Sequence, residues 1–112
     1  MDLVEEIRQL KELLTASIRS LRKTASERAK AEKDYKVLLR QEALRLRDEG
    51  MAIGMITLTV YGIPEVALAR ELRDITDATY QANLEAIQSY KLQRRLLDNQ
   101  VGREWGNTGG QL

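Results

Sequence analysis

The sequence contains no cysteine and no histidine, and these two absences remove most catalytic and metal-binding chemistry. Without cysteine the chain forms no disulfide and offers no thiolate ligand, which is compatible with a reducing cytosol. Without histidine it lacks the commonest metal ligand, the commonest general base and every nucleophile–histidine pair for acyl transfer. We therefore predict a protein that is not an enzyme and that holds no metal and no other cofactor.

Glycine-rich phosphate loops and long apolar runs are also missing. Gly50, Gly54 and Gly62 have neither the spacing of a P-loop nor its Lys-Ser/Thr ending. The longest uncharged run, 50–64, has 15 residues, whereas a membrane-spanning helix needs roughly 20. The start, "MDLVEEIRQLKELL", has acids where a secretory signal has basic residues. We expect an intracellular, cytoplasmic protein with no membrane partner.

A single proline, Pro64, and the few glycines divide the 112 residues into two long segments. No Gly or Pro interrupts 1–49, and Gly50 suits the residue that ends a helix. Pro64 suits the first position of a second helix, which meets no glycine until Gly102. The apolar residues of the first segment follow an 11-residue repeat, typical of a nearly straight helix: Leu3, Ile7, Leu10, Leu14, Ile18, Leu21, Ala25 and Ala29.

Two long helices with a short connection predict an all-α fold in which they form an antiparallel hairpin. We expect one domain over 1–106 and a disordered, Gly-rich tail over 107–112. The second helix has two apolar stripes, and the first of them serves the hairpin: Leu68, Leu72, Ile75, Tyr90, Leu97 and Val101. The second stripe predicts a helical-bundle homo-oligomer, with an interface at Tyr80, Leu84 and Ile87 that also includes Met55 and Leu58.

The connecting segment "GMAIGMITLTVYG" carries no charge. Its "ITLTVY" alternates like a strand, yet Met51, Met55 and Leu58 also form one face of a short helix between glycines. We favour the short helix and keep the extended alternative. Exposed, Met-rich apolar surface often marks a binding site, so residues 51–61 either belong to the core or dock on another protein.

The first long helix has a one-sided basic face. Ten Lys and Arg stand against four Asp and Glu in 19–47, and eight of the ten fall within about 140° of the helix circumference. They are Arg19, Arg22, Lys23, Lys30, Lys33, Lys36, Arg40 and Arg47. Such a face attracts polyanions. The alternatives are a solvated face with local pairs such as Glu32 with Lys36, or pairing with the acidic 48–77 block of a neighbouring subunit.

A smaller basic cluster, "SYKLQRR", follows in the second helix with Tyr90, Lys91, Arg94 and Arg95. Tyrosine and arginine stack on bases while lysine and arginine neutralise phosphates, so this cluster is a candidate nucleotide clasp. Tyr90 also lies on the first apolar stripe, which makes a core position with the hydroxyl at the surface the stronger interpretation.

Residues 35–106 resemble small helical proteins encoded by phages and prophages of Gram-positive bacteria. The resemblance rests on "YKVLLRQEALRLRDEGMAIGMITLTVYGIPEVALARELRDITDATYQANLEAIQSYKLQRRLLDNQ" together with "REWG". In these proteins a long helix ends in Glu-Gly, a short apolar segment ends in Gly, and a second long helix begins. The resemblance implies a phage accessory protein acting inside a bacterial cell, and it assigns no catalytic residue.

Two hypotheses for function follow. The first is a non-catalytic homo-oligomer that captures an anionic ligand through its basic helix faces, either a nucleotide signal of host defence or nucleic acid. The second is an inhibitor or adaptor that docks on a host or phage protein through the apolar segment 51–61.

Overall fold

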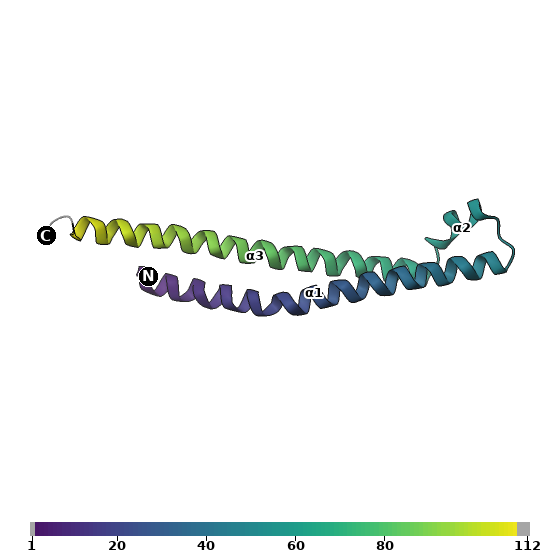
Figure 1. Ribbon diagram of the computed structural model, residues 1–112, viewed down its shortest axis with the longest axis horizontal. Coiled ribbons are helices and arrows are strands. Elements are labelled where there is room, and N and C mark those ends of the chain that lie inside the picture. The colour runs from purple at the N-terminus through teal and green to yellow at the C-terminus, as the bar shows by residue number, and fades with distance from the viewer. Residues whose placement is uncertain (1, 110–112) are drawn as a thin grey trace. The chain divides into compact units, whose positions relative to one another are not determined.

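Three α-helices account for nearly all of residues 2–109, which are the residues that the computed structural model describes. They are α1 (Leu3–Asp48), α2 (Ile53–Val60) and α3 (Pro64–Gly109), and no strand occurs among the described residues (Figure 1). The predicted all-α class is therefore confirmed. Helix α3 includes 107–109, so the first half of the predicted disordered tail is helical instead. The remaining residues of that tail, 110–112, lie outside the described residues.

Helix α1 begins and ends with recognisable capping interactions. At its start the Asp2 carboxylate accepts a hydrogen bond from the Glu5 backbone N–H at 2.8 Å, which satisfies one of the unpaired donors of the first turn. At its end Gly50 has φ +90°. The Gly50 N–H donates to the Arg47 carbonyl at 2.9 Å and the Met51 N–H to the Leu46 carbonyl at 3.1 Å. This pair of bonds is a Schellman motif, so the prediction that Gly50 ends the helix is confirmed.

The apolar segment between the long helices forms a helix and not a strand. Ala52 is extended, with φ −64° and ψ 145°, and α2 follows it directly. Ile56 and Val60 are buried on one side of α2 and form a core cluster with Leu46 of α1. Partly buried side chains pack around this cluster: Leu39, Ala43, Met51 and Ile63. Helix α2 is therefore anchored to the end of α1 by one face.

The contacts between residues divide the chain into two compact units. One unit comprises Met1–Arg22 with Gln81–Leu112, and the other comprises Lys23–Tyr80. Within the first unit the Asn83 side-chain amide donates to the Ser17 carbonyl at 2.9 Å. Within the second unit Arg28 contacts Asp77. In each unit a segment of α1 therefore packs against a segment of α3. The single domain over 1–106 stays a prediction.

The face that α1 buries follows a seven-residue repeat and not the predicted 11-residue repeat. Buried or half-buried positions alternate at spacings of four and three, typical of two helices that wind around each other. They are Leu3, Ile7, Leu10, Leu14, Ser17, Leu21, Thr24, Arg28, Ala31, Tyr35, Leu38 and Glu42. Ile18, which the longer repeat includes, is 49 % exposed. The 11-residue repeat was drawn through apolar residues alone. It does not describe the buried face because that face also contains the polar residues Ser17, Thr24 and Arg28.

The two apolar stripes of α3 also differ from the prediction. The stripe assigned to the hairpin is exposed at its start, where Leu68, Leu72 and Ile75 are 65, 54 and 53 % exposed. The stripe assigned to the oligomer is covered within one chain: Ile87 is only 7 % exposed, and Tyr80 and Leu84 are half-buried. Ile87 is therefore already covered within one chain, and the oligomer interface stays a prediction. Met55 and Leu58 are exposed, at 53 and 76 %.

Candidate functional site

The lysines on the basic face of α1 pair with acids on the same helix. Lys30 donates to Asp34 at 2.8 Å, and Lys36 lies 3.2 Å from Glu32, the pair expected from the sequence. More distant pairs join Lys23 to Glu27 and Lys33 to Asp34, each at 4.0 Å. The hydrogen bond to Asp34 raises the pKa of Lys30 above its ordinary value, so the ammonium group stays protonated. These lysines are therefore partly neutralised by local acids.

The arginines of the basic face differ from its lysines. Arg19, Arg22, Arg40 and Arg47 are exposed, and among the described residues none of them forms an ion pair. Two of them, Arg40 and Arg47, belong to the unit formed by Lys23–Tyr80, and the other two belong to the other unit. The free guanidinium groups are thus the part of the predicted anion face that remains available to a ligand.

The predicted clasp at 90–95 belongs to the unit that contains Arg19 and Arg22. Tyr90 is half-buried, in line with a core position, whereas Lys91, Arg94 and Arg95 are exposed. Arg94 lies 3.9 Å from Asp98.

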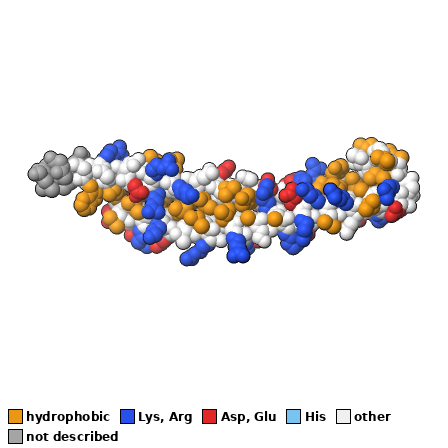
Figure 2. Space-filling model, viewed as in Figure 1, with side chains coloured by type: hydrophobic (Ala, Val, Ile, Leu, Met, Phe, Trp, Pro, Cys, Tyr) orange, Lys and Arg blue, Asp and Glu red, His pale blue; other side chains and the backbone are white. Residues whose placement is uncertain are grey.

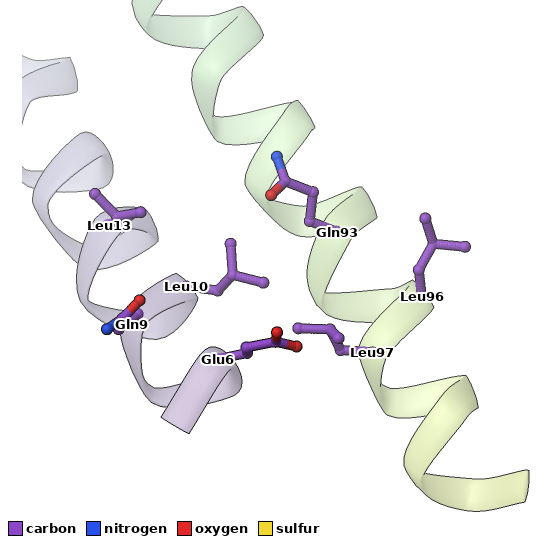
Figure 3. A pocket seen from close by; sticks show the side chains of 7 residues that line it. All are labelled: Glu6, Gln9, Leu10, Leu13, Gln93, Leu96 and Leu97. Atoms are coloured by element: carbon purple, nitrogen blue, oxygen red, sulfur yellow. The ribbon is translucent and has the colours of Figure 1, made fainter. Parts of the chain in front are cut away.

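Next to this cluster the same unit has an apolar cavity of about 460 Å³ between its α1 and α3 segments (Figure 3). Its walls are Leu10, Leu13, Leu96 and Leu97, with Glu6, Gln9 and Gln93 around them. None of the predicted anion-binding residues lines this cavity.

Sequence reasoning missed a polar cluster in the unit formed by Lys23–Tyr80. Its ion pair joins Arg28 Nε to Asp77 Oδ1 at 2.6 Å, and the same guanidinium lies 5.1 Å from the centre of the Tyr80 ring. The guanidinium of Arg73 lies 4.5 Å from the ring centre of Tyr35, which is only 4 % exposed. The hydrogen bond to Asp77 raises the pKa of Arg28, so the contact is made by a permanent cation.

A cavity of about 270 Å³ lies beside this cluster and is lined by Arg28, Glu32, Arg73, Asp74 and Asp77. Two cations against three carboxylates give its walls a net charge of −1, which does not favour an anionic ligand. No group of three or more acidic side chains among the described residues is arranged to hold a metal ion. A spacing shared by the two helices, Arg-x3-Glu/Asp-x2-Tyr, is the sequence signal that marks the cluster.

The outer face of α2 exposes large apolar side chains. Ile53 is 80 % exposed and Leu58 is 76 % exposed, with Met55 beside them, and hydrophobic side chains gather over α2 in the space-filling view (Figure 2). The Thr57 hydroxyl donates to the Ile53 carbonyl at 3.4 Å, so even this polar group is turned back onto the helix. The face therefore offers a partner apolar contact with almost no competing hydrogen-bonding group.

Gly54 lies in the middle of this face and has no structural role in the chain. It is helical, and a Cβ atom added to it would meet nothing within 4 Å. Glycine inside a helix is less stable than alanine by about 1 kcal/mol. The described fold therefore places no steric demand for glycine at this position, and the bare backbone there leaves room for close approach of another molecule.

No single helix among the described residues is long and apolar enough to cross a membrane. The pair Ile53–Val60 and Pro64–Gly106, bent by 59°, meets the same length and composition test only when its two helices are taken together.

Comparison of the chain with protein-family models, curated proteins and solved structures finds no match.

Proposed function

We propose that this protein is a non-catalytic adaptor that docks on a protein partner through the outer face of α2. The observation that carries the proposal is the division of α2 into two apolar faces. One face, with Ile56 and Val60, is buried against α1. On the other side Met55 and Leu58 are exposed, at 53 and 76 %. A short helix held by one face and open on the other resembles the helices that dock into grooves on partner proteins.

The energy available at this face is adequate for a specific contact. Complete burial of one large aliphatic side chain contributes about 1.5–3 kcal/mol. Met55 and Leu58 therefore supply on the order of 3 kcal/mol together before the costs of association. The matching site on the partner is an uncharged apolar groove, because α2 offers no charge and the Thr57 hydroxyl is already bonded to the helix backbone. Charged surfaces are poor alternatives for the same reason.

An antiparallel hairpin of α1 and α3 is the second part of the proposal. Within one unit Ser17 contacts Asn83 while Leu10 shares a cavity with Leu97. Residue numbers thus fall along α3 as they rise along α1. Within the other unit Arg28 contacts Tyr80 and Tyr35 contacts Arg73, which repeats this order. The connection that carries α2 would then form one end of the hairpin.

The homo-oligomer remains part of the proposal, with a revised interface. Leu68, Leu72 and Ile75 share one side of α3 at spacings of four and three, and each is more than half exposed. A second copy of the chain that packs its own α3 on this stripe would bury it by symmetry. The phage setting and the bacterial cytoplasm are further proposals, and they rest on the resemblance of residues 35–106 alone.

A pull-down experiment tests the docking proposal. The tagged protein and its Met55→Ser/Leu58→Ser variant are compared in a bacterial extract, with Val37→Ser/Leu92→Ser as the matched control. The control also removes two apolar side chains that are about half exposed, at 48 and 51 %. We expect a partner that the wild type and the control retain and the α2 variant loses, while circular dichroism stays unchanged. Retention by all three proteins contradicts the proposal.

Capture of an anion is a second candidate function, and the free arginines of α1 favour it. Arg40 and Arg47 lie two helical turns apart within one unit, and neither is neutralised by a neighbouring acid among the described residues. Calorimetry with a cyclic dinucleotide and with single-stranded DNA tests this candidate. Binding to nucleic acid should weaken steeply with salt, and Arg40→Ala/Arg47→Ala should reduce that slope. Absence of heat with both probes at low salt contradicts it.

A further inference from the structure

The two long helices carry the same three-residue pattern within the unit formed by Lys23–Tyr80. In α1 it consists of Arg28, Glu32 and Tyr35, and in α3 it consists of Arg73, Asp77 and Tyr80. Each arginine precedes its acid by four residues and its tyrosine by seven. Positions seven apart lie on the same line of two helices that wind around each other. Each helix thus presents one cation and one aromatic ring, in the same order, to the other helix.

The contacts between the two patterns are reciprocal. The guanidinium of Arg28 lies over the ring of Tyr80 at 5.1 Å from its centre. The guanidinium of Arg73 lies over the ring of Tyr35 at 4.5 Å. Arg28 also pairs with Asp77 at 2.6 Å, and no buried side-chain nitrogen or oxygen among the described residues lacks a hydrogen-bond partner. The side chains of this ion pair are 42 and 48 % exposed, so water also solvates its charges.

We propose that this duplicated Arg–acid–Tyr pattern fixes the orientation and the register in which α1 and α3 pair. Orientation follows from the order of the residues. In an antiparallel pair each arginine meets the tyrosine of the other helix, as the structure shows. In a parallel pair with the patterns level, Arg28 would stand beside Arg73, and Tyr35 beside Tyr80. The like charges would repel, and neither cation would have an aromatic ring beneath it.

Register follows from a shift of one heptad. Such a shift keeps the other seam residues of this unit in place, because the seam repeats every seven residues. The same shift breaks the contacts between the two Arg–acid–Tyr patterns. In one direction Arg28 would move from Asp77 and Tyr80 to Arg70 and Arg73. In the other direction it would move to the apolar Leu84 and Ile87, where it would lose both the carboxylate and the aromatic ring that it now contacts.

Distance measurements between spin labels test the proposal on the full chain. The sequence has no cysteine, so Lys23→Cys and Ala67→Cys introduce the only labelling sites. Both positions are exposed and belong to the same unit. In an antiparallel pair they lie far apart along the axis, so a one-heptad slip of about 10 Å changes their separation directly. When the labelled protein is diluted with unlabelled chain to suppress distances between copies, the wild-type pattern should give one narrow distance distribution.

The decisive variant is Arg28→Leu/Arg73→Leu, which removes both cations and keeps the rings and the acids. We expect a second distance, displaced by several ångströms, while helicity by circular dichroism is retained. The control Arg40→Leu/Arg47→Leu removes the same charge at exposed positions and should keep one distance. If the arginine variant fails to fold, Tyr35→Leu/Tyr80→Leu replaces it and should also show the second distance. A single unchanged distance in a helical variant overturns the proposal.

Discussion

Replacement of Gly54 by alanine separates the stability of α2 from its docking function. The added methyl group meets nothing within 4 Å, and Gly54 has no positive φ that would require glycine. Alanine should therefore stabilise the helix by about 1 kcal/mol. If α2 opens locally, this corresponds to about fivefold slower amide hydrogen exchange in α2. If the chain unfolds as one unit, the midpoint temperature should rise by about 4 °C.

The same methyl group should weaken docking, because it occupies the space that a partner would use to approach the backbone. Gly50→Ala is the contrasting control. A Cβ at Gly50 also meets nothing within 4 Å, but its φ of +90° is strained for alanine and should cost about 1–2 kcal/mol. Faster hydrogen exchange in Gly54→Ala would show that this glycine serves the fold. That result would refute the reasoning.

Three further predictions address the core, the oligomer and the charges. Leu46 is 5 % exposed and packs with Ile56 and Val60 of α2 in the core cluster. Leu46→Ala should therefore lower the free energy of unfolding by about 2–5 kcal/mol and release α2 from α1, which hydrogen exchange should detect as fast exchange confined to α2. Leu72→Lys/Ile75→Lys should reduce the mass in light scattering toward the chain mass of 12.8 kDa, and an unchanged larger mass would exclude this stripe as the interface. The Arg8 hydrogen bond holds the pKa of Glu5 below its ordinary value, so the small stability that it provides is present above the ordinary carboxyl pKa and is lost as the pH falls through the lowered value. Arg8→Ala should return the Glu5 pKa toward the ordinary value in an NMR titration, and an unchanged pKa would contradict this assignment.

The ends of the helices could be predicted from the sequence because they depend on local chemistry. Gly50 was expected to end the first helix, and its positive φ and Schellman bonds explain why. Pro64 was expected at the first position of the second long helix and lies there. The short helix over 53–60 was favoured over a strand, and α2 has this form. In each case a few neighbouring residues decide the conformation.

The packing faces could not be predicted because they depend on the other helix. Arg28 and Arg73 interrupt the apolar pattern of the seam, so stripes drawn through large apolar residues led away from it. The resulting error placed Ile87 at the surface although it is 7 % exposed, and placed Leu68 in the seam although it is 65 % exposed. The reciprocal ring contacts with Tyr80 and Tyr35, together with the ion pairs to Asp77 and Asp74, explain why arginine is tolerated there.

The predicted anion site is the least determined part of the sequence interpretation. Local ion pairs such as Lys30 with Asp34 reduce the net charge of the basic face. A solvated face with such pairs was one of the alternatives to anion binding. The residues proposed to act together are divided between two units: Arg19 lies with Tyr90 in one, and Arg40 lies in the other. Their joint action on one ligand therefore remains a hypothesis.

Site-specific photo-crosslinking in bacterial cells tests the central claim most directly. A photoreactive residue replaces Leu58 on the outer face of α2, or Leu92, which is also exposed but lies on α3. The account predicts a discrete crosslinked protein from position 58 that is absent from position 92 and is lost when Gly54→Ala is added. Identical products from both positions, or no product from position 58, would contradict docking through α2.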